Sequence, residues 1–184
     1  MRITSGTLLG ALLAVAVAAS AAPLRTDPAN SAVNVEFKQM GVTARAAFKK
    51  FAARIDYDPA KPEASRASME IDTASLDVGE AELTREVAKK EWFNSAQYPK
   101  ATFVSSSIKP AGPGKLNVTG KLSIKGKTGD VSFPLTVKNE AGKQIFEGAL
   151  PIRRLAYNIG EGEWKDTSMV ADEVTIRFRI AATQ

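Results

Sequence analysis

The sequence has neither cysteine nor histidine among its 184 residues. Without cysteine, the chain forms no disulfide bond, thiolate nucleophile or cysteine-based metal site. Without histidine, it lacks the commonest ligand of transition metals and the base of a Ser-His-Asp triad. An enzyme built from this chain would need carboxylates, lysine, tyrosine or a bound cofactor. The composition therefore favours a binding protein, and we predict no catalytic residue, no metal site and no resident cofactor.

The N-terminus has the features of a secretory signal peptide. Arg2 precedes an apolar stretch without charge from Leu8 to Ala19, which is shorter than the ~20 residues that span a bilayer. Small residues follow in an Ala-x-Ala pattern, which predicts cleavage after Ala21 or Ala22. We expect a signal peptide over 1–21, a single domain over 22–184 without a transmembrane span and, in a Gram-negative host, a periplasmic location.

The charge balance is only mildly basic. Lysine and arginine total 25 against 20 aspartates and glutamates, a formal net charge of +5. This excess is spread along the chain rather than gathered in a patch. It fits a mild attraction to anionic lipid headgroups and argues against a nucleic-acid partner.

Most of the chain alternates between apolar and polar residues, the pattern of half-buried strands. In the last run, Val174, Ile176 and Phe178 alternate with Thr175 and Arg177. Short connections, several with glycine, separate the runs and imply antiparallel neighbours. Eight such runs are expected: 33–37, 42–48, 67–71, 101–108, 116–124, 131–137, 146–152 and 174–180.

One segment departs from the strand pattern. Between Gly79 and Glu91, Leu83 and Val87 lie four residues apart among charged residues. This spacing predicts a short amphipathic helix, with acids near its start and lysines near its end. We interpret its charges as a solvated helix face rather than a catalytic cluster.

Eight antiparallel strands with one apolar face form either a sandwich or a closed barrel. An eight-stranded barrel is either filled by side chains or able to hold one small ligand. The presumed inner face includes small residues, which would leave room for an apolar ligand beside larger aromatic ones. These small residues are Ala44, Ala46, Ala67, Gly120 and Gly148. A fully packed interior remains the alternative.

The order of short motifs along the chain resembles the YceI-like family of secreted proteins. The markers are Lys38-Gln39-Met40-Gly41-Val42, Ile55-Asp56-Tyr57-Asp58, Glu91-Trp92-Phe93, Tyr98-Pro99, Gly120 to Gly126, Ile152 to Leu155, Ile159 to Trp164 and Asp172-Glu173-Val174. Each is weak alone, and their order and spacing over about 150 residues carry the match. The resemblance implies an all-β, eight-stranded antiparallel, lipocalin-like barrel with one helix near an end. It also implies a cavity for an isoprenoid lipid, homodimers in some members, and no catalytic residue.

We predict that aromatic and aliphatic side chains line this cavity. The candidates are Phe37, Phe48, Met69, Ile71, Trp92, Phe93, Tyr98, Phe103, Leu122, Phe133, Leu135, Phe146 and Phe178. Arg85, Arg153 and Arg154 are candidates for an anionic headgroup, because a guanidinium pairs well with phosphate. Solvated surface charge is the alternative for each of these arginines.

The leading hypothesis is a periplasmic carrier for an isoprenoid-type lipid such as a polyprenyl phosphate or a quinone. A second hypothesis is an accessory or stress-response protein with a packed barrel that binds no lipid. A third, an isomerase or hydrolase using carboxylates or Tyr157, requires a buried acid facing the cavity. The inward faces read from the sequence carry none.

Overall fold

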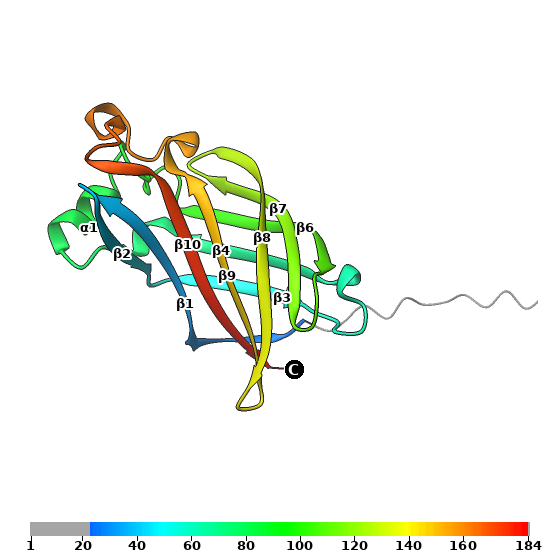
Figure 1. Ribbon diagram of the computed structural model, residues 1–184. Coiled ribbons are helices and arrows are strands. Elements are labelled where there is room, and N and C mark those ends of the chain that lie inside the picture. Colours follow the sequence, from blue (N-terminus) through cyan, green and yellow to red (C-terminus); the bar gives the residue numbers. More distant parts are fainter. Residues whose placement is uncertain (1–22, 184) are drawn as a thin grey trace, which may run out of the picture.

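A computed structural model describes residues 23–183, and within them ten antiparallel strands form one strongly curled sheet, a half-barrel (Figure 1). The sheet order is β3-β4-β6-β7-β8-β9-β10-β1-β2-β5. The strands are β1 (Arg25–Gln39), β2 (Val42–Phe48), β3 (Phe51–Asp56), β4 (Arg66–Asp72), β5 (Leu76–Asp77), β6 (Lys100–Pro110), β7 (Lys115–Ile124), β8 (Lys127–Glu140), β9 (Lys143–Arg153) and β10 (Val170–Thr183). Apolar side chains of alternate positions point to the concave side and form its core.

The expected all-β antiparallel fold is confirmed, but the strand count of eight is too low. β2 and β3 are separated only by Lys49 and Lys50; the amide of Lys49 donates to the carbonyl of Ser75 in the β4–β5 connection, and the carbonyl of Lys50 accepts from the amide of Asp72 at the end of β4. Phe48 and Phe51 both pack into the core although they lie three residues apart, and residues on one face of a continuous strand lie an even number apart. The alternation of apolar and polar residues is therefore interrupted between them, and the sequence pattern did not reveal β3. β5 has two residues, too few for a periodic signal.

The two ends of the sheet approach each other through the N-terminal part of β1. The register of β1 with β10 shifts between Asp27 and Ala32, and the strand bends sharply there (Figure 1). Ser31 Oγ donates to the Asp27 carbonyl and accepts from the amide of Ala181, which holds the bend. Beyond it, the chain forms a bridge from Leu24 to Ile55 of β3.

The predicted helix is present but shorter than expected. α1 spans Ala81–Val87 rather than Gly79 to Glu91. Its continuation turns back, with the amides of Phe93 and Ser95 bonded to the carbonyls of Val87 and Ala88. The turn carries two large apolar side chains, Trp92 and Phe93, into the core, which a continued helix would expose.

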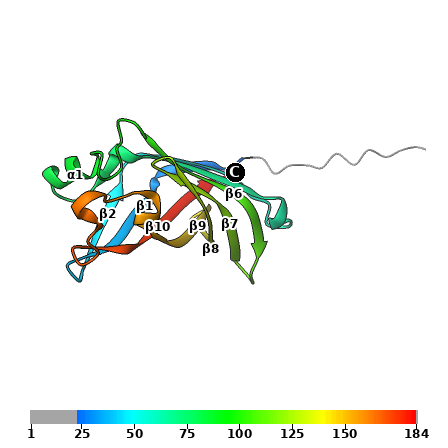
Figure 2. The ribbon, with the colours of Figure 1, turned by 90° about the horizontal axis from the view of Figure 1, so that it is seen from above.

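Short 3-10 turns complete the fold: η1 (Pro62–Ala64), η2 (Thr73–Ser75), η3 (Arg154–Tyr157) and η4 (Gly162–Lys165). In both views, α1 and the orange segment that contains η3 and η4 lie at the same end of the half-barrel (Figure 2). The predicted signal peptide lies outside the described residues. No helix in 23–183 has the length and apolar character needed to cross a membrane.

Candidate functional site

The concave side of the sheet encloses two adjoining apolar cavities. Cavity 1, of about 100 Å³, lies between β3, β4 and β6–β10. Cavity 2, of about 190 Å³, lies nearer α1 and is bounded by β1, β2, β7 and β10. Both are large compared with a single water, which needs roughly 10–15 Å³ on this scale.

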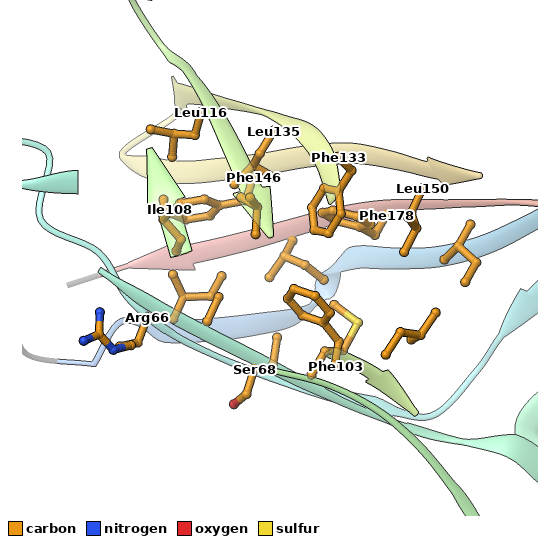
Figure 3. A pocket seen from close by; sticks show the side chains of 18 of the residues that line it. Arg66, Ser68, Phe103, Ile108, Leu116, Phe133, Leu135, Phe146, Leu150 and Phe178 are labelled. Carbon is orange, nitrogen blue, oxygen red and sulfur yellow. The ribbon is translucent and has the colours of Figure 1, made fainter. Parts of the chain in front are cut away.

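Aromatic rings form much of the wall of cavity 1 (Figure 3). The ring centroid of Phe133 lies 5.5 Å from that of Phe103 and 5.5 Å from that of Phe178. Such tilted and edge-to-face contacts are the favoured arrangements of aromatic pairs. The three rings come from β6, β8 and β10, so they hold facing parts of the sheet together along one side of the cavity.

Two inward glycines do not enlarge the cavity, contrary to the sequence-based expectation. A Cβ at Gly148 would lie 2.4 Å from Cζ of Phe178, and one at Gly120 would lie 2.5 Å from Cε2 of Phe103. The space that these glycines leave is therefore filled by the two rings. Of the five small residues expected to leave room, those that do border a cavity are Ala67 in cavity 1 and Ala44 and Ala46 in cavity 2.

We expect Gly120→Ala to lower the free energy of unfolding by about 2–3 kcal/mol and Gly148→Ala by about 1 kcal/mol. At Gly148 the ring of Phe178 can rotate away, whereas a Cβ at Gly120 also meets the backbone carbonyl oxygen of Val104 at 2.4 Å. Urea denaturation measures both, with the exposed Ser132→Ala as a control near zero. A Gly120→Ala protein as stable as the parent would contradict this packing.

Cavity 2 combines an apolar wall with a tryptophan pair. Phe37, Phe48 and Phe93 line it, and the Phe48 and Phe93 rings meet edge to face at 6.0 Å. Trp92 packs on Trp164 with centroids 5.3 Å apart, and both contribute to the wall. Trp164 lies in η4, so the pair joins two segments that are distant in the sequence.

Arg154 is a buried part of this wall and is only 2% exposed. Its Nε donates to the carbonyl of Ala171, Nη1 to those of Ile159 and Gly160, and Nη2 to those of Trp164 and Val170. All five guanidinium N–H groups are thus used by backbone carbonyls. Its Cζ also lies 5.7 Å from the ring centroid of Trp92, a cation–π contact. Burial lowers the pKa of this guanidinium.

A second buried cation ties the same end of the fold together. Nζ of Lys125, in the turn between β7 and β8, donates to the carbonyls of Lys90 and Asn158 and to the Glu161 carboxylate at 2.9 Å. The hydrogen bond from this ammonium lowers the pKa of Glu161 below its ordinary value of 4.5. Lys125 therefore joins the segment after α1 to the segment between η3 and η4.

All the aromatic and aliphatic candidates except Tyr98 line one of the two cavities. Those of cavity 1 are Met69, Ile71, Phe103, Leu122, Phe133, Leu135, Phe146 and Phe178, and those of cavity 2 are Phe37, Phe48, Ile71, Trp92, Phe93 and Leu122. Tyr98 lies outside both linings. Its ring instead covers Gly126 in the turn between β7 and β8, where a Cβ would lie 3.1 Å from Cε1 of Tyr98.

The three candidate headgroup arginines lie in different surroundings. Arg85 on α1 and Arg153 at the end of β9 are exposed and line neither cavity. Arg154 lines cavity 2, but its saturated guanidinium has no N–H left for a phosphate. The expectation that Arg154 is available to a headgroup is therefore corrected. Its guanidinium instead holds the backbone of residues 159–171 in place through hydrogen bonds to their carbonyls.

The structure adds residues that the sequence did not single out. Arg66 lies at one end of cavity 1 with its guanidinium turned away from the apolar side chains (Figure 3). It occupies an outward position of β4, so the alternation gave no reason to select it. Trp164 could have been found as a large aromatic residue in a glycine-rich loop. The buried state of Lys125 left no sequence signal.

Acids play little part in the lining. Cavity 1 has none among its lining side chains, and cavity 2 has Glu86, whose carboxylate pairs with Lys89 at 2.5 Å. Tyr157, whose pKa burial raises, lines neither cavity. Among residues 23–183, no group of three or more acids is placed to hold a metal ion.

Comparisons with known proteins agree on the family. The sequence profile of the YceI-like domain matches residues 24–182. A UPF0312 protein of Pseudomonas putida is 36% identical over 143 residues, which cover 76% of this chain and 74% of its own length. The crystal structure of BcnA from Burkholderia cenocepacia superimposes with a TM-score of 0.84 at 53% identity, over 86% of this chain and 99% of that one.

A polyisoprenoid binding domain from Saccharophagus degradans, described as implicated in plant cell wall breakdown, shares the fold. Its TM-score is 0.68 at 17% identity, over 89% of this chain and 98% of that one. The resemblance seen in the motifs is thus confirmed by sequence and by fold. The chain belongs to the YceI-like family.

Proposed function

We propose that this protein binds an isoprenoid-type lipid, a polyprenyl phosphate or a quinone, with the tail in cavities 1 and 2. The observation that supports it is the pair of adjoining cavities with apolar walls inside one curled sheet. An apolar cavity of this kind stays dry until an apolar ligand fills it. Removal of the tail from water then drives binding at roughly 25 cal/mol per Å².

The polarity of the two cavities favours one orientation of the ligand. Cavity 1 has a single charged residue in its lining, Arg66 at its end. Cavity 2 includes Gln39 and Glu86 and lies beside α1, where Arg85 is exposed and forms no ion pair with described residues. The polar end is therefore assigned to the α1 side, where Arg85 remains a candidate headgroup partner, and the tail extends from there through cavity 2 toward cavity 1.

The rim of cavity 2 suits entry of an apolar chain. Leu83 of α1 lines cavity 2 and is 41% exposed. Val42, the register partner of the lining residue Gln39, is 70% exposed, and neighbouring Met40 is 72% exposed. Large apolar side chains in water at the open end of a binding cavity are typical of a ligand or lipid contact.

The alternative of an accessory protein with a packed interior expects no cavity larger than a few waters. Cavities of about 100 Å³ and about 190 Å³ favour the lipid carrier over it. We place the carrier in the periplasm on the strength of the signal-peptide features of residues 1–21. N-terminal sequencing of protein from the periplasmic fraction tests this location, and an intact Met1 would contradict it.

The lipid proposal is tested with a cavity-filling variant. Ala46 is 5% exposed and lines cavity 2, so Ala46→Leu occupies space that the ligand needs. We expect it to weaken binding of farnesyl phosphate about tenfold, which corresponds to roughly 1.4 kcal/mol. Native mass spectrometry and a titration of the fluorescence of Trp92 and Trp164, which both line cavity 2, measure this binding.

The matched control is Ala52→Leu, the same change at an exposed position of β3, which should bind like the parent. Lipid extraction from protein purified from its host adds an independent test. A parent protein that carries no lipid and takes up neither farnesyl phosphate nor a quinone would overturn the proposal.

A further inference from the structure

Four side chains belong to the walls of both cavities. They are Ile71, Ala101, Leu122 and Ile176. Each cavity has otherwise its own set of lining residues. The two cavities therefore meet at this group, which we call the belt.

The belt crosses the interior from one wall of the half-barrel to the other. Ile71 of β4 and Ala101 of β6 are register partners, and Leu122 lies on β7, the next strand of the sheet. Ile176 comes from β10, which passes over β4 and β6 on the facing wall (Figure 1). Ala101 and Leu122 are each 5% exposed, and Ile71 and Ile176 pack on the same core cluster.

We propose that the belt is a constriction that sets the length of isoprenoid tail this protein accepts, a reading that rests on the proposed lipid binding. A tail short enough for one cavity need not pass between these side chains. A longer tail must run through the belt to use both cavities, and the three branched aliphatic side chains have few alternative rotamers in which to make room. The belt thus separates chains by length rather than by headgroup.

Ala101 is the position where the belt is most sensitive to added volume, because it has the smallest side chain of the four. Ala101→Leu narrows the passage without changing charge or polarity. Leu122→Ala widens it at the register neighbour of Phe103. The two variants change the width of the passage through the belt in opposite directions. The proposal therefore stays testable if one of them is too unstable to study.

The test uses farnesyl, geranylgeranyl and undecaprenyl phosphate, which share a headgroup and differ in tail length. We expect Ala101→Leu to leave the dissociation constant for farnesyl phosphate within about twofold and to raise that for undecaprenyl phosphate about tenfold. Leu122→Ala is expected to favour undecaprenyl over farnesyl phosphate relative to the parent. Ala46→Leu, which changes cavity 2 only, serves as the control: it should weaken all three ligands without discriminating against the longer chain.

The outcomes separate this inference from the proposed function. If Ala101→Leu weakens all three ligands by the same factor, or none of them, the belt does not select by length, although the lipid proposal stands. If the parent protein binds none of the three, the proposed function falls and the length selection with it.

Discussion

Arg154→Met is expected to lower the free energy of unfolding by about 3–5 kcal/mol, enough to unfold much of a marginally stable domain. The substitution leaves five backbone carbonyls without their hydrogen-bond donor. Two of these are the carbonyl of Trp164 in η4 and that of Val170 at the start of β10. Methionine keeps most of the apolar stem, so the loss isolates the hydrogen bonds and the cation–π contact with Trp92. Urea denaturation followed by fluorescence measures the change.

The adjacent arginine provides the matched control. Arg153 is exposed, and Arg153→Met should change the stability by less than about 0.5 kcal/mol. Arg154→Lys retains the charge but offers three donors from one atom in place of a planar fork, so it should recover only part of the loss. If Arg154→Met and Arg153→Met had equal effects, the five carbonyl contacts would contribute nothing, and the assigned role would be wrong.

The cavity walls were largely predictable because alternation reports which face of a strand is buried. In β8, Phe133 and Leu135 share a face with Val131 and Val137, and the first two line cavity 1. Alternation of apolar and polar residues identifies the buried face of any strand that is paired and covered on one side. Both conditions hold along β7 to β10. The same local pattern predicted the antiparallel order of these strands.

The volume of the cavities was not predictable, since it depends on which side chains fill the space left by small residues. Gly120 and Ala46 are both small and inward, yet only Ala46 borders a cavity, because the ring of Phe103 covers Gly120. That ring comes from the neighbouring strand at a register set by the whole sheet, with a shift between Ser105 and Ser107. No local pattern contains this information.

The roles of single charged residues were equally hidden from the sequence. Arg153 and Arg154 are adjacent and chemically identical, but one is exposed and the other is enclosed by carbonyls of residues 159–171. What distinguishes them is the end of the strand between them: Arg153 is the last residue of β9, whereas Arg154 is the first residue of η3 and is buried there. The guanidinium of Arg154 pairs with backbone carbonyls rather than with an acidic side chain. The sequence therefore contains no acidic partner that could have indicated its buried role.

Lys125→Met is expected to lower the free energy of unfolding by about 2–3 kcal/mol at neutral pH, because two carbonyls and the Glu161 carboxylate lose a buried donor. The backbone at Lys125 has a φ of +48°, which methionine tolerates no worse than lysine. The change therefore acts through the ammonium group. Lys127→Met, two residues away and exposed, should stay within about 0.5 kcal/mol of the parent.

The contact between Lys125 and Glu161 also predicts how this stability depends on pH. The pKa of Glu161 is lower in the folded protein than its ordinary value of 4.5, so the unfolded chain binds the proton more tightly. Its contribution is complete above about pH 5 and is lost as the pH falls through the folded pKa. Urea denaturation of the parent and of Glu161→Gln between pH 7 and pH 3 should show a stability gap that is widest near neutrality and closes in acid. A gap that stays constant over this range would mean that the carboxylate charge does not hold Lys125, leaving the two carbonyls as its only effective partners at this end of the half-barrel.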